Sequence, residues 1–454
     1  MKVAKFGGTS LASAEQFRKV GQIVASDPQR RIIVVSAPGK RHKADTKVTD
    51  MLIACADRQL AFGSAEQEVR AVAARYAEIA AGLGLPDTIA QVVTNDLHAR
   101  LASDTTHRAR FVDTLKAAGE DNCAKLFAQY LASIGVPAAY VSPKEAGLLV
   151  SAEFGNAQVL PESYDHLHAL RGRREVVVFP GFFGYSKAGD VVTFPRGGSD
   201  ITGSIVAAGV KAELYENFTD VDSVFVASPG IIHRPCAIVE ITYREMRELS
   251  YAGFSVFHEE ALEPAYHARV PVCIRNTNNP TALGTMIVPE RTLAAGLVTG
   301  IACDAGFCSI YLSKYLMNRE VGFGRRLLQI LEDERLSFEH CPTGIDNFSV
   351  ILREKLFDAE KEARILERIR IELKVDDVSV EHGLALVMLV GEGMRHTVGI
   401  AARATAALAR GGVNIEMINQ GSSEVSMMFG VKAADSHNAV RTLYNEFFLK
   451  PPAS

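Results

Sequence analysis

The chain has 454 residues, of which 48% are hydrophobic and 22% are charged, and its formal net charge is −4. This length predicts roughly two to four domains with sizeable cores, and the slightly acidic balance excludes a general nucleic-acid binder. No apolar stretch approaches membrane-spanning length, and the chain opens on a strand-like run rather than a signal peptide, which indicates no membrane association. The seven cysteines form no Cys-x2-Cys pair, so they predict reduced thiols in a cytoplasmic protein and no metal held by side chains alone.

A short apolar strand and a glycine turn begin the chain. Residues 2–6 form the strand, Gly7-Gly8-Thr9-Ser10 form the turn, and a helical pattern follows over 12–25. A strand, glycine turn and helix in this order cradle phosphate with backbone N–H groups. The turn has neither the Walker A pattern nor the three-glycine spacing of a dinucleotide site, so alone it is weak evidence of nucleotide binding.

A second buried strand is predicted over 31–38, followed by a polar, basic loop over 40–47 of the kind that covers a site. A helix then begins near Thr49, which local chemistry makes its cap. Apolar residues at three- and four-residue spacing predict helices from 66 to 136. Within them, Glu120 lies in an acidic first turn, where a surface glutamate would offset the helix dipole.

A polar, glycine-paired turn, Phe194-Pro195-Arg196-Gly197-Gly198-Ser199-Asp200, precedes a helical pattern over 201–210. Ser199 predicts the helix N-cap and places Asp200 in the first turn, where a carboxylate suits the dipole. Arg196 presents a planar fork for a carboxylate, and the two glycines admit an anion close to the backbone. On local chemistry alone, an ordinary capped helix start explains the turn equally well.

The strand and helix patterns alternate up to residue 275. Strands are predicted over 138–142, 175–179 and 271–275, with helices between them, which favours a mostly parallel sheet flanked by helices. Ligands of such sheets bind at the carboxyl ends of the strands, and both glycine turns follow strands. Phe182 also follows a strand, where an aromatic side chain is more often core than ligand contact.

Three motifs together resemble one family. Lys5-Phe6-Gly7-Gly8-Thr9-Ser10, Arg196-Gly197-Gly198-Ser199-Asp200 and Thr219-Asp220-Val221 stand in the order and spacing of the aspartokinases, within the amino-acid kinase superfamily. The resemblance covers essentially the whole chain. It implies an α/β fold: a three-layer αβα sandwich with a mainly parallel central sheet over 1–290, followed by two ferredoxin-like (βαββαβ) ACT domains.

The C-terminal third repeats the order strand, helix, strand, strand, helix, which suggests ferredoxin-like modules. The first module has a closing strand available, but the second has none before the chain stops. We therefore expect the strand over 296–302 to complete the second sheet, so that one ACT domain is inserted in the other; a generic oligomerisation domain is the alternative. The expected strands and helices are 307–316, 324–331, 336–341, 348–353, 359–373 and 376–380 in the first module and 385–390, 397–409, 413–418, 425–431 and 436–447 in the second, and the expected domains are 304–381 for the inserted one and 291–303 plus 382–454 for the other.

The reaction implied by the resemblance is phosphoryl transfer from ATP to the β-carboxylate of L-aspartate, giving 4-phospho-L-aspartate. A carboxylate is already a nucleophile, so catalysis rests on holding two anions in line and neutralising the transferred charge, with Mg2+ bound mainly to phosphate oxygens. The resemblance assigns catalysis to Lys5 and Asp200, aspartate binding to Thr49, Glu120, Phe182, Arg196 and Ser199, and nucleotide binding to Lys5, Gly7, Gly8, Thr9, Ser10, Thr219, Asp220, Phe225 and Ser255.

The nucleotide half departs from the family pattern. Phe225 stands where many members carry a tyrosine, the arginine that usually follows is missing from 225–230, and Ser255 replaces a common lysine. These losses leave a catalytically silent amino-acid sensor open as an alternative to the kinase. A kinase of another amino acid, such as glutamate or N-acetylglutamate, is a separate alternative, which Arg196-Gly197-Gly198-Ser199-Asp200 together with paired ACT units disfavours. The candidates to replace the missing cations are His233, Arg234, Lys187 and His258.

Regulation is implied separately by the ACT resemblance. Such domains bind an end-product amino acid at a dimer interface, so we expect a homodimer and a lysine or threonine effector, in the first step of lysine, threonine and methionine biosynthesis. The stretch 317–323 resembles the effector loop of lysine-sensitive members. Solvated loop charges are an equally good explanation, and an unregulated isoform is a third possibility. The expected effector residues are Met317, Gly322, Phe323, Glu339 and Asp346.

Overall fold

The computed structural model describes residues 1–254, 257, 259–291, 297–395, 397–421 and 425–449. The chain divides into two compact units. No helix among these described residues is long and apolar enough to cross a bilayer. The first unit comprises Met1–Val224, Ala237–Ser250 and Ser255–Arg291, and the second comprises Phe225–Cys236, Tyr251–Phe254 and Thr292–Ser454.

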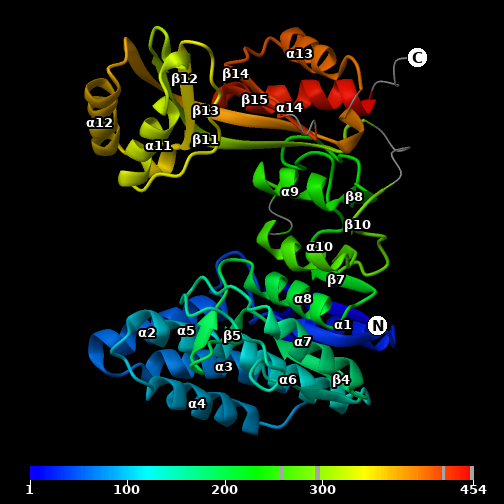
Figure 1. Cartoon of the computed structure of the whole chain (residues 1–454). Helices are drawn as coiled ribbons and strands as arrows, with labels where there is room; N and C mark the ends of the chain where they lie inside the picture. The colour runs from blue at the N-terminus through cyan, green and yellow to red at the C-terminus, as the bar shows by residue number, and fades with distance from the viewer. Residues whose placement is uncertain (255–256, 258, 292–296, 396, 422–424, 450–454) are drawn as a thin grey trace. The chain divides into compact units, whose positions relative to one another are not determined.

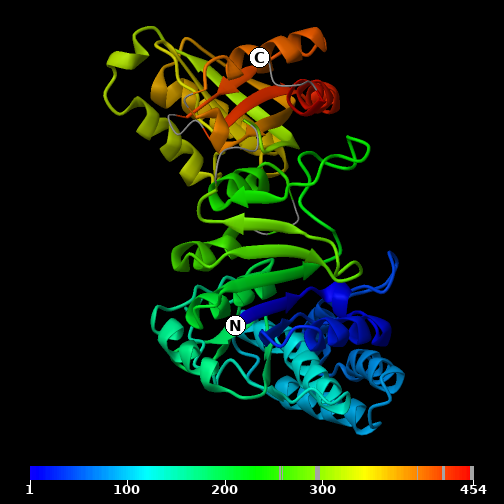
Figure 2. The same cartoon turned by 90° about the vertical axis from the view of Figure 1, so that its right-hand side faces the viewer.

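An eight-stranded sheet forms the centre of the first unit, and Figure 2 shows its green strands stacked beside blue β1. Neighbouring strands are parallel except for β9 and β10, which pair antiparallel. The central strands are almost wholly buried because helices cover both faces, which explains their continuous apolar runs. The predicted mainly parallel α/β fold is confirmed. The strands, in spatial order, are β3 (Ala138–Tyr140), β4 (Val176–Pro180), β2 (Arg30–Val35), β1 (Lys2–Phe6), β7 (Leu214–Thr219), β9 (Val272–Asn276), β10 (Thr285–Val288) and β8 (Glu240–Thr242).

Helices cover the two faces of this sheet in separate groups. Helices α1 to α6 share one hydrophobic core with β1 and β2, and in Figure 1 the blue and cyan helices α2 to α6 lie together. Helices α7 and α10 pack instead against α8, which contacts β1 and β7. Alternate residues of β1 therefore serve different layers: Phe6 joins the α1–α6 core, whereas Lys5 reaches Asp200 of α8. The helices are α1 (Ala14–Ala25), α2 (Val48–Phe62), α3 (Glu66–Gly82), α4 (Thr88–Leu101), α5 (Arg108–Lys116), α6 (Ala118–Ser133), α7 (Glu162–His168), α8 (Gly198–Gly209), α9 (Tyr243–Tyr251) and α10 (Glu263–Ala268), and a hairpin of β5 (Phe183–Tyr185) and β6 (Val191–Thr193) precedes α8.

Two of the predicted helix caps are wrong. Helix α2 has Lys47 as its N-cap, so Thr49 lies inside the first turn. Helix α8 has Gly197 as its N-cap, at φ 82°, because a glycine adopts this left-handed conformation without strain. The Gly197 carbonyl accepts the first bond, from Asp200 N at 2.8 Å, so Ser199 is helical and Asp200 lies in the first turn as predicted.

A five-stranded antiparallel sheet forms the centre of the second unit. Its two longest strands, β11 and β13, each have 14 residues and pair along nearly their whole length. The predicted strands over 376–380 and 385–390 are thus halves of one strand, β13. The strands, in spatial order, are β12 (Asn347–Arg353), β11 (Gly300–Ser313), β13 (Asp377–Val390), β15 (Ser426–Lys432) and β14 (Met417–Asn419), and the helices are α11 (Phe323–Asp333), α12 (Ala359–Arg368), α13 (Ile400–Arg410) and α14 (Ser436–Tyr444), with π-helical turns at Ile369–Leu373 and Asn445–Leu449.

The expected strand over 296–302 corresponds to the start of β11, which begins at Gly300, and residue 296 lies outside the described residues. Gly300 lies opposite Val390, and Ala302 opposite Met388, as expected for a strand of the second module. The predicted strand over 336–341 is wrong, because this segment makes only an isolated bridge between His340 and Ile351. Pro342 follows it and has no N–H to extend a ladder, which limits the pairing.

Candidate active site

A cavity of about 450 Å³ opens at the carboxyl ends of β1, β2 and β4 in the first unit. This is the edge of a parallel sheet where ligands bind. All the residues that the family resemblance assigns to aspartate and to catalysis line this cleft, although they come from five separate segments of the chain. They are Lys5, Thr49, Glu120, Phe182, Arg196, Ser199 and Asp200, joined by Gly7, Gly8, Ser36, Lys47, Asp50, Ile53, Lys116, Gly155, Phe194, Pro195, Gly197 and Gly198.

The cationic end of the cleft is built on Lys5. Its ammonium lies 2.5 Å from Oδ1 of Asp200, and the side-chain amide of Asn217 donates to the same oxygen at 2.7 Å. Lys5 is 6% exposed, so a fixed ion pair replaces most of its hydration. Asp200 thereby holds the lysine ammonium at the end of β1, beside the glycine turn.

Glu120 is a buried carboxylate that faces the cleft without a full set of partners. It is 4% exposed, and its Oε2 accepts no hydrogen bond from any described residue. Burial raises the pKa of Glu120 to about 7, although the Ala37 amide and the positive charges of Lys116 and Lys47 oppose the shift. A buried carboxylate oxygen left unpaired at a cavity wall is suited to receive an ammonium group.

Arg196 supplies the opposite charge at the cleft. Its side chain is exposed, and it makes no hydrogen bond or ion pair with any residue that the structure describes. The guanidinium fork is therefore available for a carboxylate. Ser199 lies in the first turn of the adjacent helix α8, where an anion is favoured by the helix dipole.

Phe182 forms a wall of the cleft in a strained conformation. Its φ is 76°, which is uncommon for a residue with a bulky side chain and marks a site where the surroundings enforce the shape. Its N–H donates to the Thr202 hydroxyl at 2.9 Å, and its carbonyl accepts from Phe194 N at 2.8 Å. A Cβ on Gly198 would lie 2.6 Å from the Phe182 ring, so this position requires glycine.

The glycine turn differs in two details from the prediction. The Gly7 N–H already donates to the Phe218 carbonyl at 3.1 Å, so it is engaged within the sheet edge. The amides of Gly8 and Thr9 make no hydrogen bond to a described residue in the turn, and these two are the groups available to an anion. The Ser10 hydroxyl, which is buried, bonds the Thr277 hydroxyl at 2.7 Å and anchors the turn rather than facing the cleft.

The expected nucleotide residues are only partly brought together. Thr219 ends β7, next to the glycine turn, and its hydroxyl donates to Asp220 at 3.3 Å. Phe225 belongs to the second unit, and Ser255 and His258 lie outside the described residues. Among the candidate substitute cations, Lys187 is ion-paired with Glu162 at 2.7 Å, and His233 and Arg234 are exposed in the second unit.

Sequence reasoning missed Lys116, which lines the cleft. It ends α5, where its ammonium pairs with Asp113 at 2.9 Å and lies 5.5 Å from the centre of the Phe182 ring. Asp113 also accepts the backbone N–H groups of Gly155 and Thr193, so it fixes two loops of the cleft wall. The local pattern of α5 does not predict a binding role for this lysine. Lys116 reaches the cleft because α5 ends just before α6, whose first turn contains Glu120.

The expected effector residues lie in the second unit. Met317 and Phe323 are buried, and Gly322 is the N-cap of α11 at φ 79°. The Asp346 side chain accepts from Leu316 N at 2.9 Å. Glu339 is ion-paired with Arg353 at 3.1 Å and accepts from the Tyr251 hydroxyl, so its charge is already matched within the unit.

Comparison with known proteins decides the family. Residues 1–276 match the amino acid kinase family, and residues 387–447 match an ACT domain. Aspartokinase 3 of Bacillus subtilis is 59% identical over 448 residues, which covers 99% of each chain. The chain belongs to the aspartokinases of the amino acid kinase family. Its activity is accordingly that of an aspartokinase, the phosphorylation of L-aspartate, as predicted, rather than that of another amino-acid kinase or of a silent sensor.

Two solved structures agree with this assignment over the whole chain. The aspartate kinase of Clostridium acetobutylicum is 37% identical, with a TM-score of 0.89, and the match covers 98% of this chain and 100% of that one. Aspartokinase III of Escherichia coli, solved in complex with aspartate and ADP, is 25% identical with a TM-score of 0.79, and covers 99% and 100%. The ACT match in the second unit supports allosteric regulation of the kinase.

Proposed function

We propose that the cleft at the ends of β1, β2 and β4 binds aspartate and is where the phosphoryl group is transferred. The observation that carries this proposal is that one cavity holds a negative and a positive group, each without a partner among the described residues. These groups are the buried Oε2 of Glu120 and the guanidinium of Arg196. An α-amino acid carries the matching ammonium and carboxylate on one carbon. Ser199 and Thr49 add hydroxyl groups at the same wall, and Phe182 closes the apolar side.

The side chain of the bound aspartate then points its β-carboxylate at the phosphoryl donor. This carboxylate is ionised at neutral pH and needs no general base. One of its oxygens forms a bond to the γ-phosphorus as the bond from that phosphorus to the ADP oxygen breaks, and ADP leaves with the electron pair. Lys5 neutralises the charge on the transferred group, and the amides of Gly8 and Thr9 cradle its oxygens.

Both ATP and Mg2+ belong to this proposal. The Escherichia coli relative was solved with ADP, which supports ATP as the phosphoryl donor here. No group of three or more His, Cys, Asp or Glu side chains among the described residues could hold a metal ion. We therefore place Mg2+ on the nucleotide phosphates, where it shields their charge, with Asp200 as the carboxylate at that end of the cleft.

The second unit supplies the regulation. We propose that residues 304–381 form one ACT domain inserted into another built from 291–303 and 382–454, since the start of β11 pairs with the end of β13. Exposed apolar side chains near the effector loop, Tyr315, Val321 and Ile345, support a homodimer formed through these domains. Lysine is the first candidate effector and threonine the second. Seven free thiols, several of them buried, support a reducing compartment, the cytoplasm.

The test separates aspartate binding from chemistry. Turnover is followed as aspartate-dependent ADP release, and hydroxylamine traps the acyl phosphate. Replacing Arg196 by lysine should raise the KM for aspartate with a small change in kcat, because a point charge cannot reproduce the two-pronged contact. An unchanged KM would show that this cleft does not hold the substrate carboxylate.

A further inference from the structure

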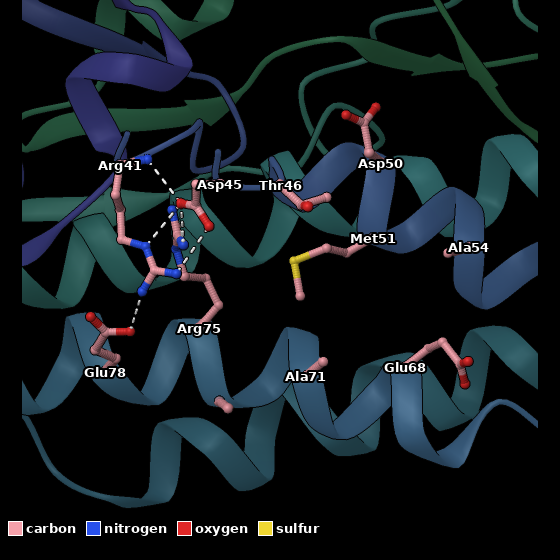
Figure 3. Close-up of a pocket in the computed structure, with 11 residues that line it drawn as sticks. Arg41, Asp45, Thr46, Asp50, Met51, Ala54, Glu68, Ala71, Arg75 and Glu78 are labelled. Atoms are coloured by element: carbon pink, nitrogen blue, oxygen red, sulfur yellow. Dashed lines mark hydrogen bonds and ion pairs between the residues drawn. The ribbon is translucent and has the colours of Figure 1, made fainter. Parts of the chain in front are cut away.

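Arg75 lies on α3, outside the cleft, and its guanidinium joins three segments of the first unit. Its side chain is 4% exposed. One end donates to Asp45 at 2.8 Å, and the other donates to the carbonyls of Gly39 at 2.6 Å and Ala12 at 3.3 Å. Figure 3 shows Arg75 rising from its helix toward Asp45 in the loop. A rigid fork of donors is suited to hold several acceptors at fixed angles.

Two of these segments touch the glycine turn directly. Ala12 ends the short 3-10 turn that starts at Gly8, and the Gly39 N–H donates to the Gly8 carbonyl at 2.8 Å. The two glycine backbones are in such close contact that a Cβ on Gly39 would lie 2.6 Å from the Gly8 carbonyl carbon. Gly39 therefore cannot move toward Gly8 without displacing it, and movement away would break the bond to the Gly8 carbonyl. Arg75 holds both the end of the turn and the backbone packed against it.

The third segment is the loop that leads into α2. Asp45 accepts from the Arg41 backbone and side chain at 2.9 Å and from Arg75, and these partners, Arg41 first, hold the pKa of Asp45 far below its usual range. Arg41 also reaches Glu78 of α3 at 2.7 Å. Two residues after Asp45 the chain reaches Lys47, which lines the cleft together with Thr49.

The side of this loop that faces α3 borders a cavity. A cavity of about 480 Å³ lies between the loop, α2 and α3, and Figure 3 shows Met51 and Ala71 facing each other across it. Asp50 lines both this cavity and the cleft, so the segment between them is a thin wall. The position of the wall therefore depends on its polar ties to α3. Among the described residues, the tie from Asp45 to Arg75 is far less exposed than the tie from Arg41 to Glu78.

We propose that Arg75 is a positioning residue for phosphoryl transfer, because it fixes the Gly8 amide and the loop before Thr49 relative to Lys5. The inference rests on the proposed phosphate-binding role of the glycine turn. It assigns Arg75 no contact with either substrate. Loss of its guanidinium should loosen the phosphoryl end of the cleft most. The two charged contacts to aspartate should remain, because Glu120 lies on α6 and Arg196 in the turn before α8, and Thr49 contributes only a neutral hydroxyl from inside α2.

The test compares Arg75→Ala with Glu78→Gln in the full-length enzyme, using ADP release at varied aspartate. Arg75→Ala should lower kcat roughly 10- to 100-fold, the size expected for a misplacement near 1 Å, and change the aspartate KM less than about threefold. Glu78→Gln removes only the ion pair between Arg41 and Glu78, in which the glutamate side chain is 62% exposed. Its kcat should stay within about twofold of the wild-type value. Guanidinium ion, added at millimolar concentration, should restore part of the lost kcat, because the truncated side chain opens onto the existing cavity.

Asp45→Asn is the second variant, for the case in which Arg75→Ala does not fold. It keeps the bonds from Arg75 to Gly39 and Ala12 and weakens the bonds that Asp45 accepts from Arg75 and Arg41, so its kcat should fall less than that of Arg75→Ala. The inference is overturned if folded Arg75→Ala has wild-type kcat, or if the activity lost merely follows the folded fraction and guanidinium restores none of it. A parallel Lys5→Met variant separates the two claims: if it is inactive while Arg75→Ala is normal, only the role of Arg75 is wrong, whereas normal turnover in both also refutes the proposed site.

Discussion

Glu120 couples the stability of the free enzyme to aspartate binding, because it is a carboxylate buried without a full set of partners. Its folded-state pKa of about 7 lies above the usual 4.5. Below pH 4.5 the group is protonated in the folded and unfolded states alike and has no effect. As the pH rises, the unfolded chain loses this proton first, so the free energy of unfolding falls, and the loss is complete above pH 7. The full penalty is about 3 kcal/mol, at 1.4 kcal/mol for each unit of pKa.

Replacing Glu120 by glutamine should therefore remove this penalty. Between pH 5.5 and pH 8.5 the wild-type free energy of unfolding should fall by about 2 kcal/mol relative to that of the variant, as measured by urea unfolding of both proteins at each pH. Saturating aspartate should raise the free energy of unfolding of the wild type at high pH but not that of the variant, because the aspartate ammonium compensates the buried charge of Glu120. The variant should lose aspartate binding while gaining stability at high pH.

The same shift predicts a kinetic pH profile. The aspartate ammonium needs the ionised form of Glu120, so kcat/KM for aspartate should fall about tenfold for each unit below pH 7 and level off above it. A gap in unfolding free energy that is independent of pH, or a flat profile of kcat/KM through pH 7, would refute the assignment of a buried, ammonium-binding carboxylate.

Three further variants test separate parts of the structure. Lys5→Met should lower kcat roughly 100- to 1,000-fold with little change in the aspartate KM, because it removes charge stabilisation of the transferred group; a matching rise in KM would contradict this. Arg196→Lys should raise the aspartate KM about tenfold, equivalent to 1.4 kcal/mol, with kcat nearly unchanged. Glu216→Ala should cost about 3–5 kcal/mol in urea unfolding, since it leaves the buried guanidinium of Arg30 and that of Arg275 without their shared carboxylate; a loss below about 1 kcal/mol would show that water replaces it.

Much of the fold followed from the sequence because its signals are local. Buried parallel strands leave continuous apolar runs, and the glycine turns mark strand ends, so the sheet and the neighbourhood of the cleft could be predicted. The helix starts were less certain, because a cap depends on backbone conformation: Gly197 in the left-handed region displaced Ser199 from the cap. The two long strands of the second unit were predicted as four, since the sequence does not show that pairing continues across Gly306 and Gly383, both at positive φ.

The missed site residues share one cause. Lys116 and Arg75 lie on helices whose patterns look ordinary. The contacts that single them out are with segments distant in the chain: the Phe182 ring for Lys116 and the Gly39 carbonyl for Arg75. The Gly7 amide was expected at the phosphate, but its bond to Phe218 depends on the pairing of β1 with β7. Glu120 was recognised from the family resemblance, whereas local chemistry favoured a surface position. Its burial follows from the packing of α6 against the strands, which no local pattern records.

The decisive measurement for the proposed site is hydroxylamine trapping of the acyl phosphate in wild type, Lys5→Met and Arg196→Lys, with ADP release followed alongside at varied aspartate. The structure predicts aspartate-dependent trapping in the wild type, strongly reduced trapping at unchanged KM in Lys5→Met, and normal trapping at raised KM in Arg196→Lys. Wild-type trapping and KM in both variants would contradict the placement of substrate and chemistry in this cleft.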